Sequence, residues 1–281
     1  MDRLANILRK NGHNLTVAPT TGPVMAGSLA REHVARGADL VIAAGGDGTI
    51  NEVAEGMMHS PAALGVLPLG TANCLAVEIG LPRKPERAAE ALENCRPRRV
   101  AAGRLECYGG RVQRHFLLMA GAGLDAHVVY RLDAALKSRT GKFAYWVASW
   151  SLLGRNLPEF DVEVDGQVRR SSFALLSRVR NYGGDFRIAP SVTLFDNDFE
   201  VVLFAGRSSF QYVKYFMGMA LNRLEGMRGV TVLRATRVRL TAPEDQRIYI
   251  QIDGEFVGPL PAEVRIVPDA VTLLAPEGYG T

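Results

Sequence analysis

Apolar residues in the first part of the chain switch between helical spacing and short continuous runs. Leu4, Ile7 and Leu8 share one helical face, and Asn11-Gly12 follows as a stop signal. The apolar run at 39–44 shows no alternation, which favours a strand of a parallel sheet covered on both faces. The other predicted elements are helices at 26–36, 50–58 and 73–79 and strands at 15–18 and 64–67. This alternation of strand and helix predicts a doubly wound α/β architecture.

The pattern changes near residue 98, where short strands separated by turns replace the alternation. Strands are predicted at 112–119, 160–168, 173–179, 199–204, 230–240, 247–252, 263–267 and 270–274. Helical spacing persists mainly at 127–153 and 210–224. The length of 281 residues suits two domains. We therefore expect an α/β domain over residues 1–97 and a β-rich domain over residues 98–281.

The composition is typical of a globular protein, and the charge limits the classes of partner that we expect. Hydrophobic residues make up 47% and charged residues 22%, which argues against disordered, collagen-like and coiled-coil proteins. The net charge of +4 permits an anionic ligand or a membrane surface, but no dense basic block indicates nucleic-acid binding. Three cysteines without close pairing suggest reduced thiols in the cytoplasm. No signal peptide or spanning segment is predicted, since the apolar stretch at 143–153 is too short to cross a bilayer.

The strongest chemical signal is the run Gly45-Gly46-Asp47-Gly48-Thr49, directly after the apolar strand. Glycines let backbone N–H groups approach phosphate oxygens closely, and the positive end of the next helix points to the same place. Thr49 and Glu52 fit a capping box at the start of that helix. Asp47 could hold Mg²⁺ or accept a hydroxyl proton. The same residues are also good turn formers, but the strand–glycine–helix context favours a phosphate site.

A second loop of the same design joins the next strand to the next helix. It contains Gly70, Thr71 and Asn73, with Thr71 expected as the helix cap. Two such loops at the carboxyl edge of one parallel sheet form the crevice where open α/β folds bind ligands.

The stretches GGDGTINEV (45–53) and LGVLPLGTANCLAVEIGLP (64–82) resemble the catalytic domain of the diacylglycerol kinase family. That family includes bacterial lipid kinases and the related sphingosine and ceramide kinases. Later segments are similar to further family motifs in the same order: Gly121 to Ala126, Tyr182-Gly183-Gly184 with Ala189-Pro190, and Asp253-Gly254-Glu255. The resemblance covers nearly the whole chain. It implies a NAD-kinase/diacylglycerol-kinase-like nucleotide domain followed by a β-sandwich lipid domain.

The resemblance also implies the site residues and cofactors, namely ATP and Mg²⁺. The expected ATP contacts are Thr20, Gly45, Gly46, Asp47, Gly48, Thr49, Asn51, Glu52, Gly70, Thr71 and Asn73. Glu255 stands where the family has a proton acceptor, although Asp-Gly before it is also an ordinary hairpin turn. Asp196-Asn197-Asp198 resembles the family turn that holds a structural Mg²⁺, with Thr193 and Asp198 offering carbonyl oxygens. A solvated acidic turn is the alternative.

The sequence departs from the family pattern at three places. Cys74 and Ala101 stand where bacterial diacylglycerol kinases have aspartates, and neither can join a Mg²⁺–water–carboxylate network. In sphingosine-kinase-like members, which also lack the first of these acids, the aspartate matching Asp47 is the base. Asp47 therefore shares the catalytic prediction with Glu255. The family's first strand with its Asn-Pro-x-x-Gly loop has no match, so we expect it either to lie upstream or to be missing.

These observations predict a lipid kinase that transfers the γ-phosphate of ATP to a lipid hydroxyl, with diacylglycerol as the first choice of substrate. A sphingoid base or another lipid is the nearest alternative. A NAD kinase, which shares the Gly-Gly-Asp-Gly loop, and a catalytically impaired nucleotide- or lipid-binding protein are the rivals. We expect a lipid substrate at a membrane surface, peripheral membrane contact and no nucleic-acid partner, and a homodimer is a further option.

Overall fold

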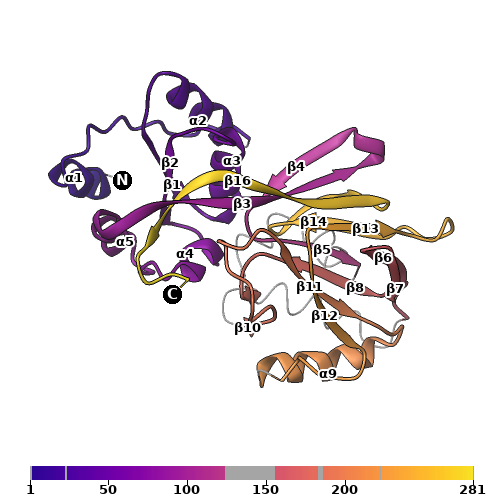
Figure 1. Cartoon of the computed structure of the whole chain (residues 1–281). Helices are drawn as coiled ribbons and strands as arrows, with labels where there is room; N and C mark the ends of the chain where they lie inside the picture. Colours follow the sequence, from indigo (N-terminus) through magenta and orange to yellow (C-terminus); the bar gives the residue numbers. More distant parts are fainter. Residues whose placement is uncertain (1, 23, 124–155, 183–185, 222, 281) are drawn as a thin grey trace. The chain divides into compact units, whose positions relative to one another are not determined.

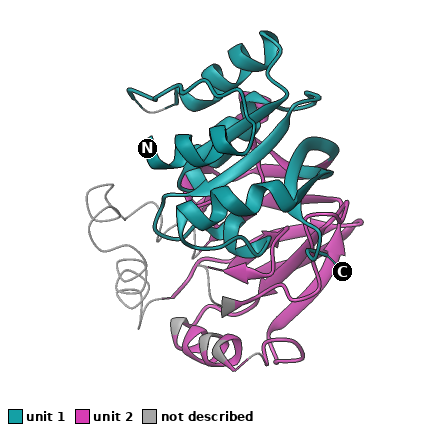
Figure 2. Cartoon of the chain, turned by 90° about the vertical axis from the view of Figure 1, so that its left-hand side faces the viewer, with its two compact units in different colours: residues 1–102, 268–281 teal, residues 103–267 magenta. Residues whose placement is uncertain are grey.

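The computed structural model describes residues 2–22, 24–123, 156–182, 186–221 and 223–280 (Figure 1). The chain divides into two compact units (Figure 2). Unit 1 comprises residues 1–102 and 268–281, and unit 2 comprises residues 103–267. The second unit thus begins five residues later than the predicted boundary, and the last residues of the chain return to the first unit. The predicted helix at 127–153 and the motif residues 124–126 and 183–184 lie outside the described residues.

Unit 1 contains the predicted parallel strands. β1 (Leu40–Gly45) pairs with β2 (Ala63–Pro68) in parallel, from Leu40 opposite Ala63 to Gly45 opposite Pro68. β2 pairs on its other side with β16 (Ala262–Pro276), also in parallel. β2 is almost wholly buried, whereas only Ala43 of β1 is buried, because β1 stands at the end of the strand order. β1 is therefore less buried than the sequence predicts.

Helices follow the strands of unit 1 as the apolar spacing predicts. They are α1 (Asp2–Lys10), α2 (Ala26–Ala35), α3 (Asp47–Gly56), α4 (Cys74–Glu78) and α5 (Pro85–Ala91), the last not predicted. Glycines let α2 and α3 cross closely: a Cβ on Gly56 would lie 2.1 Å from the carbonyl oxygen of Gly27. The strand expected at 15–18 is absent, since residues 13–20 form no regular element.

Two long strands each contain residues of both units. β3 (Cys95–Cys107) crosses the boundary at residue 102, and β16 crosses it at residue 267. The sequence predicts two strands for the second of these, but the backbone continues through Pro268 and Asp269. Asp269, between the two predicted strands, has a positive φ of 48°, which locally interrupts the extended backbone.

Unit 2 holds an antiparallel sheet in the order β12-β11-β8-β5-β14-β15. Its strands are β5 (Met119–Gly123), β8 (Phe173–Ser177), β11 (Phe199–Phe204), β12 (Val230–Ala235), β14 (Tyr249–Ile252) and β15 (Glu255–Pro259). A second set pairs β13 (Arg237–Thr241) with β6 (Phe160–Val164) and with β16, and β6 with β7 (Gln167–Ser171). In the same unit the end of β3 pairs with β4 (Val112–Phe116).

The core of unit 2 is built from both sets of strands. Buried side chains from both sets form one cluster, including Phe116, Phe160, Phe199, Leu240 and Ile250. This confirms an α/β architecture combined with a β-sandwich.

The remaining described elements are α9 (Ser209–Ala220), the short strands β9 (Asn181–Tyr182) and β10 (Phe186–Arg187), and the short 3₁₀ turns η1 (Leu92–Asn94) and η2 (Tyr108–Gly110). Within the described part of the chain, every helix is too short or too polar to cross a bilayer.

Candidate nucleotide site and catalytic carboxylates

The two glycine loops of unit 1 are in direct backbone contact. Because β1 and β2 are parallel neighbours, the loops that follow them leave the same edge of the sheet. The N–H of Leu69 donates a 3.0 Å hydrogen bond to the carbonyl oxygen of Gly45. A Cβ on Gly70 would lie only 2.5 Å from the Cα of Gly46. The structure thus brings the two loops together, and the approach requires glycine at position 70.

Helix α3 begins one turn earlier than the sequence predicts. Gly46 has an extended backbone and precedes the first helical residue, Asp47, and the first helical bond runs from the N–H of Ile50 to the carbonyl of Gly46. Thr49 lies inside the first turn, where its side chain packs over Gly45. The predicted Thr49–Glu52 capping box is therefore wrong. The amides of the first turn of α3 point toward the glycine loops, which is a favourable place for an anion.

Asp47 joins the first loop to the second. Its Oδ1 accepts a 3.2 Å hydrogen bond from the N–H of Leu75, in the first turn of α4. The residue before α4 is Asn73, which has a left-handed backbone with a φ of 49°. The Asn73 amide exchanges two 2.8 Å hydrogen bonds with the backbone of Gly70. Asn73, and not the exposed Thr71, therefore organises the second loop, and the expectation of a Thr71 cap is wrong.

Glu52 of α3 caps a different helix. Its carboxylate accepts hydrogen bonds from the N–H groups of Val24 (3.3 Å) and Ala26 (3.2 Å) at the start of α2. These bonds satisfy amides that have no partner within the helix. Asn51 is buried beside it on α3, and Thr20 is exposed in the irregular segment before α2. Glu52 thus holds α2 against α3, a role that the ATP-contact prediction did not include.

In unit 2 the Asp253-Gly254 pair forms the turn between β14 and β15. Both residues have positive φ (47° and 82°), as a two-residue hairpin requires. The Asp253 carboxylate accepts three backbone hydrogen bonds, from Leu117, Leu118 and Met119, at 2.8 to 3.1 Å. It therefore anchors the entry to β5.

Glu255, the first residue of β15, stands differently from Asp253. Its side chain is 45% exposed and forms a 3.1 Å ion pair with Arg114 of β4. The carboxylate is consequently oriented by one guanidinium and accessible to solvent. This is a suitable arrangement for a group that must accept a proton from a bound alcohol.

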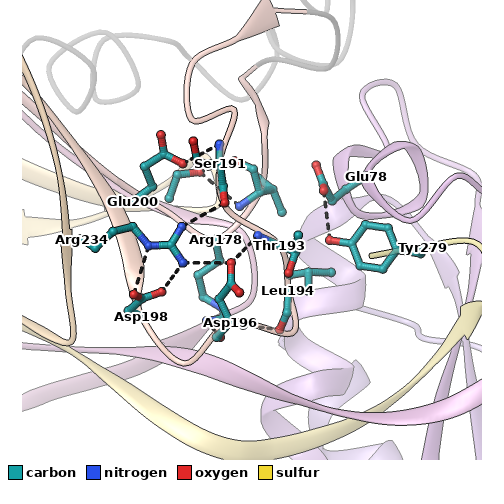
Figure 3. A network of polar contacts seen from close by, with 12 residues as sticks. Glu78, Arg178, Ser191, Thr193, Leu194, Asp196, Asp198, Glu200, Arg234 and Tyr279 are labelled. Atoms are coloured by element: carbon teal, nitrogen blue, oxygen red, sulfur yellow. Dashed lines mark hydrogen bonds and ion pairs between the residues drawn. The ribbon is translucent and has the colours of Figure 1, made fainter. Parts of the chain in front are cut away.

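The residues predicted for a structural Mg²⁺ lie around an arginine in unit 2 (Figure 3). Arg234 of β12 forms ion pairs with both Asp196 and Asp198. The Asp196 carboxylate also accepts the N–H of Thr193 at 2.8 Å. Burial acts to raise the pKa of Asp196, but these hydrogen bonds and the Arg234 charge hold that pKa below its ordinary value. Among the described residues, no group of three His, Cys, Asp or Glu side chains is arranged to hold a metal ion.

Two family descriptions match this chain. The diacylglycerol kinase catalytic domain matches residues 1–105, and the YegS C-terminal NAD kinase β-sandwich-like domain matches residues 119–275. The diacylglycerol kinase of Bacillus subtilis is 29% identical over 92% of this chain and 86% of its own length. A YegS-like lipid kinase of Chromohalobacter salexigens, named as probable, is 30% identical over 96% of this chain and 87% of its own length.

This chain belongs to the diacylglycerol kinase family of lipid kinases. A solved diacylglycerol kinase structure from Bacillus anthracis shares the fold, with a TM-score of 0.75 and 21% identity over 97% of this chain and 88% of that one. The matches to lipid kinases over nearly the whole chain favour this class over the rival NAD kinase.

The two departures that replace an aspartate fall on well-defined positions of unit 1. Cys74 is the first residue of α4 and is half-buried, directly before the amide that bonds to Asp47. Ala101 lies on β3 and is buried. Arg114 and Arg234 were missed from the sequence because strand pairing, rather than local spacing, brings them to their carboxylates.

Proposed function

We propose that this lipid kinase transfers the γ-phosphate of ATP to the hydroxyl of diacylglycerol at a membrane surface, producing phosphatidic acid. The observation that carries the proposal is the backbone contact between Gly46 and Gly70 at the carboxyl edge of two parallel strands. Membership of the diacylglycerol kinase family and the names of the relatives support the lipid substrate.

The two glycine loops are suited to a triphosphate. A phosphate chain needs N–H donors that it can approach without intervening side chains, and the close contact of the Gly45–Gly46 and Gly70 loops supports such a site. The first turn of the ten-residue helix α3 adds a positive end at the same loop. We assign the triphosphate to the backbone of Gly45, Gly46 and Gly48. Gly70, whose N–H donates to Asn73 Oδ1, supplies the close approach of the second loop, and Thr49 and Asn73 keep the loops in shape.

Asp47 is the residue of these loops that suits a hard cation. One carboxylate oxygen accepts the Leu75 amide, and the second is an oxygen donor of the kind that Mg²⁺ prefers. Bound Mg²⁺ would neutralise charge on the transferred phosphoryl group. Cys74 does not extend this donor set, because sulfur is a soft ligand and Mg²⁺ prefers oxygen. Asp47 would therefore hold the cation together with the oxygens of the nucleotide itself.

Two carboxylates compete for the proton of the lipid hydroxyl. Glu255 is exposed and oriented by Arg114, so it can receive the proton without losing a structural hydrogen bond to the backbone. Asp47 would have to combine proton transfer with its bond to the Leu75 amide. We therefore assign the proton to Glu255, and Asp253 to holding the turn that presents it.

The experiment is phosphate transfer from γ-³²P-ATP to diacylglycerol, monoacylglycerol, sphingosine and ceramide in mixed micelles. Labelled phosphatidic acid with the wild-type chain, and its loss with Asp47→Asn, would support the proposal. The matched control is Asp161→Asn, an exposed carboxylate of β6 paired with Arg170 at 3.8 Å. If sphingosine alone were labelled, the substrate would be a sphingoid base and not diacylglycerol. ATP binding with no labelled lipid would identify a binding protein that has lost catalysis.

A further inference from the structure

The loop before β11 is held by two arginines. Arg178, directly after β8, is fully buried and donates to the carbonyl oxygens of Leu194 (2.7 Å) and Asp196 (3.1 Å). Arg234 approaches from β12, and each of its guanidinium nitrogens has an acceptor in this segment. The two residues place two positive charges around the loop that the family resemblance assigns to a divalent cation.

Arg234 contacts both carboxylates of the turn, including that of Asp196, which the resemblance assigns to the cation. Its Nε donates to Asp198 Oδ2 at 3.0 Å, one terminal nitrogen reaches Asp196 Oδ2 at 2.9 Å, and the other donates to the carbonyl of Ser191 at 3.1 Å. The position of the guanidinium follows from sheet register, because Arg234 lies directly opposite Glu200 in the β11–β12 pair. Burial raises the pKa of Glu200, whose carboxylate accepts the N–H of Ser191 at 2.9 Å.

Several oxygens of this segment already accept hydrogen bonds. The carbonyls of Ser191, Leu194 and Asp196 accept from the two arginines, and that of Thr193 accepts the N–H of Asp196 at 3.1 Å. Mg²⁺ keeps several waters but is bound through one or two carboxylates, and here the Asp196 carboxylate is already paired with the guanidinium and with the N–H of Thr193. The backbone of Asn197, the middle residue of the turn, does not have a positive φ.

We propose that the guanidinium of Arg234 takes the place of a divalent cation at the Asp196–Asp198 turn. The carboxylates of the turn then need no metal ion, because the positive charge beside them is supplied by a side chain of the protein. Two charges that a metal would bring are supplied by Arg178 and Arg234 instead. The site is half-exposed, with 36% of the Arg234 side chain and 33% of the Asp196 side chain accessible, so a cation could reach it if the arginine were removed.

The test measures the apparent melting temperature of the full chain without nucleotide, in EDTA and in millimolar Mg²⁺ or Mn²⁺. Wild type should melt at the same temperature in all three. Arg234→Met should melt several degrees lower in EDTA and recover part of the loss with Mn²⁺. Adding Asp196→Asn to Arg234→Met should abolish the recovery. Arg237→Met, which removes an arginine paired with Glu263 on β13, the next strand along the chain, should show no response to metal.

Two results would overturn the proposal. One is a metal-dependent rise in the wild-type melting temperature that Asp196→Asn removes, because a cation would then bind beside the arginine. The other is an Arg234→Met variant that stays folded yet shows no response to Mn²⁺. If that variant does not fold, Mn²⁺ binding to the wild type and to Asp196→Asn, followed by electron paramagnetic resonance, still decides. Equal Mn²⁺ binding to the wild type and to Asp196→Asn supports the proposal. A Mn²⁺ site that is present in the wild type and lost in Asp196→Asn contradicts it.

Discussion

The carboxylate of Glu255 and the guanidinium of Arg114 lie 3.1 Å apart although 141 positions separate them in the sequence. β15 carries the first and β4 carries the second, so only the fold of unit 2 brings them together. The pair orients a half-exposed carboxylate directly after the Asp253-Gly254 turn. This relationship separates the role of Glu255 from that of Asp253, whose oxygens are occupied by backbone amides.

Glu255→Gln should reduce kcat by about 10²–10⁴-fold, the usual contribution of a general base. ATP affinity should be nearly unchanged, because Glu255 does not belong to the glycine loops. Steady-state transfer to diacylglycerol and equilibrium ATP binding measure the two effects. Arg114→Met should lower kcat by a smaller factor, since it removes only the orientation of the carboxylate. Near-normal turnover in Glu255→Gln would indicate that Asp47, and not Glu255, accepts the proton of the lipid hydroxyl.

Asp47→Asn should abolish most turnover while leaving the fold almost intact. Asparagine keeps an oxygen that can accept the Leu75 amide, so the free energy of unfolding should fall by less than about 1 kcal/mol, the typical value of a helix cap. Asp47→Ala should lose that contribution as well. Urea unfolding, beside the Mg²⁺ dependence of kcat, distinguishes a loss of chemistry from a loss of structure. An Asp47→Asn variant with normal Mg²⁺-dependent turnover would contradict the assignment.

Gly70→Ala should weaken ATP binding and destabilise unit 1. The new methyl group would lie 2.5 Å from the Cα of Gly46 and 2.9 Å from Asn73 Oδ1, so one loop must move. Overpacking of this kind costs about 1–3 kcal/mol. Gly278→Ala is the control, because a Cβ there meets nothing within 4 Å. Isothermal titration with ATP and thermal unfolding measure both effects, and equal behaviour of the two variants would argue against loop contact.

Cys74 should be the one thiol of the three that an alkylating reagent modifies quickly, and ATP should slow the reaction. Burial raises the pKa of the thiols of Cys95 and Cys107, which keeps both in the unreactive neutral form. Cys74 is half-buried at the start of α4, beside the second glycine loop. Iodoacetamide labelling followed by peptide mass mapping gives the rates. Protection by ATP but not by sulfate would place the nucleotide there, and equal rates with and without ATP would count against it.

The contribution of Asp196 to stability should depend on pH. Burial acts to raise its pKa, but hydrogen bonds from Arg234 and the N–H of Thr193, with the charges of Arg234 and Arg178, hold that pKa in the folded chain below the ordinary value of 3.8. A lowered carboxyl pKa stabilises the fold above the ordinary pKa, and this stabilisation is lost as pH falls through the lowered value. The difference in free energy of unfolding between wild type and Asp196→Asn should therefore be largest near neutral pH and shrink in acid. Urea titrations from pH 7 to pH 3 would show the trend, and a difference that grows in acid would contradict it.

Much of the architecture could be predicted from the chain alone. The helices at α1, α2, α3 and α4 and the strands β1, β2 and β11 follow from apolar spacing and flanking glycines, which depend on a few neighbouring residues. The same holds for the glycine loops, because strand, glycine run and helix are adjacent in sequence. Local spacing could not show that β16 is one strand through Pro268, or that it returns to unit 1.

The sequence by itself determined the family, the order of the elements and the loops expected to bind phosphate. Tertiary structure alone decided which partner each polar side chain finds. Asn73 and not Thr71 shapes the second loop, Glu52 caps α2, and Arg234 lies between two aspartates. The reason is physical: backbone propensity acts over a few residues, whereas a side-chain partner depends on strand register and helix crossing, which exist only once distant segments have packed.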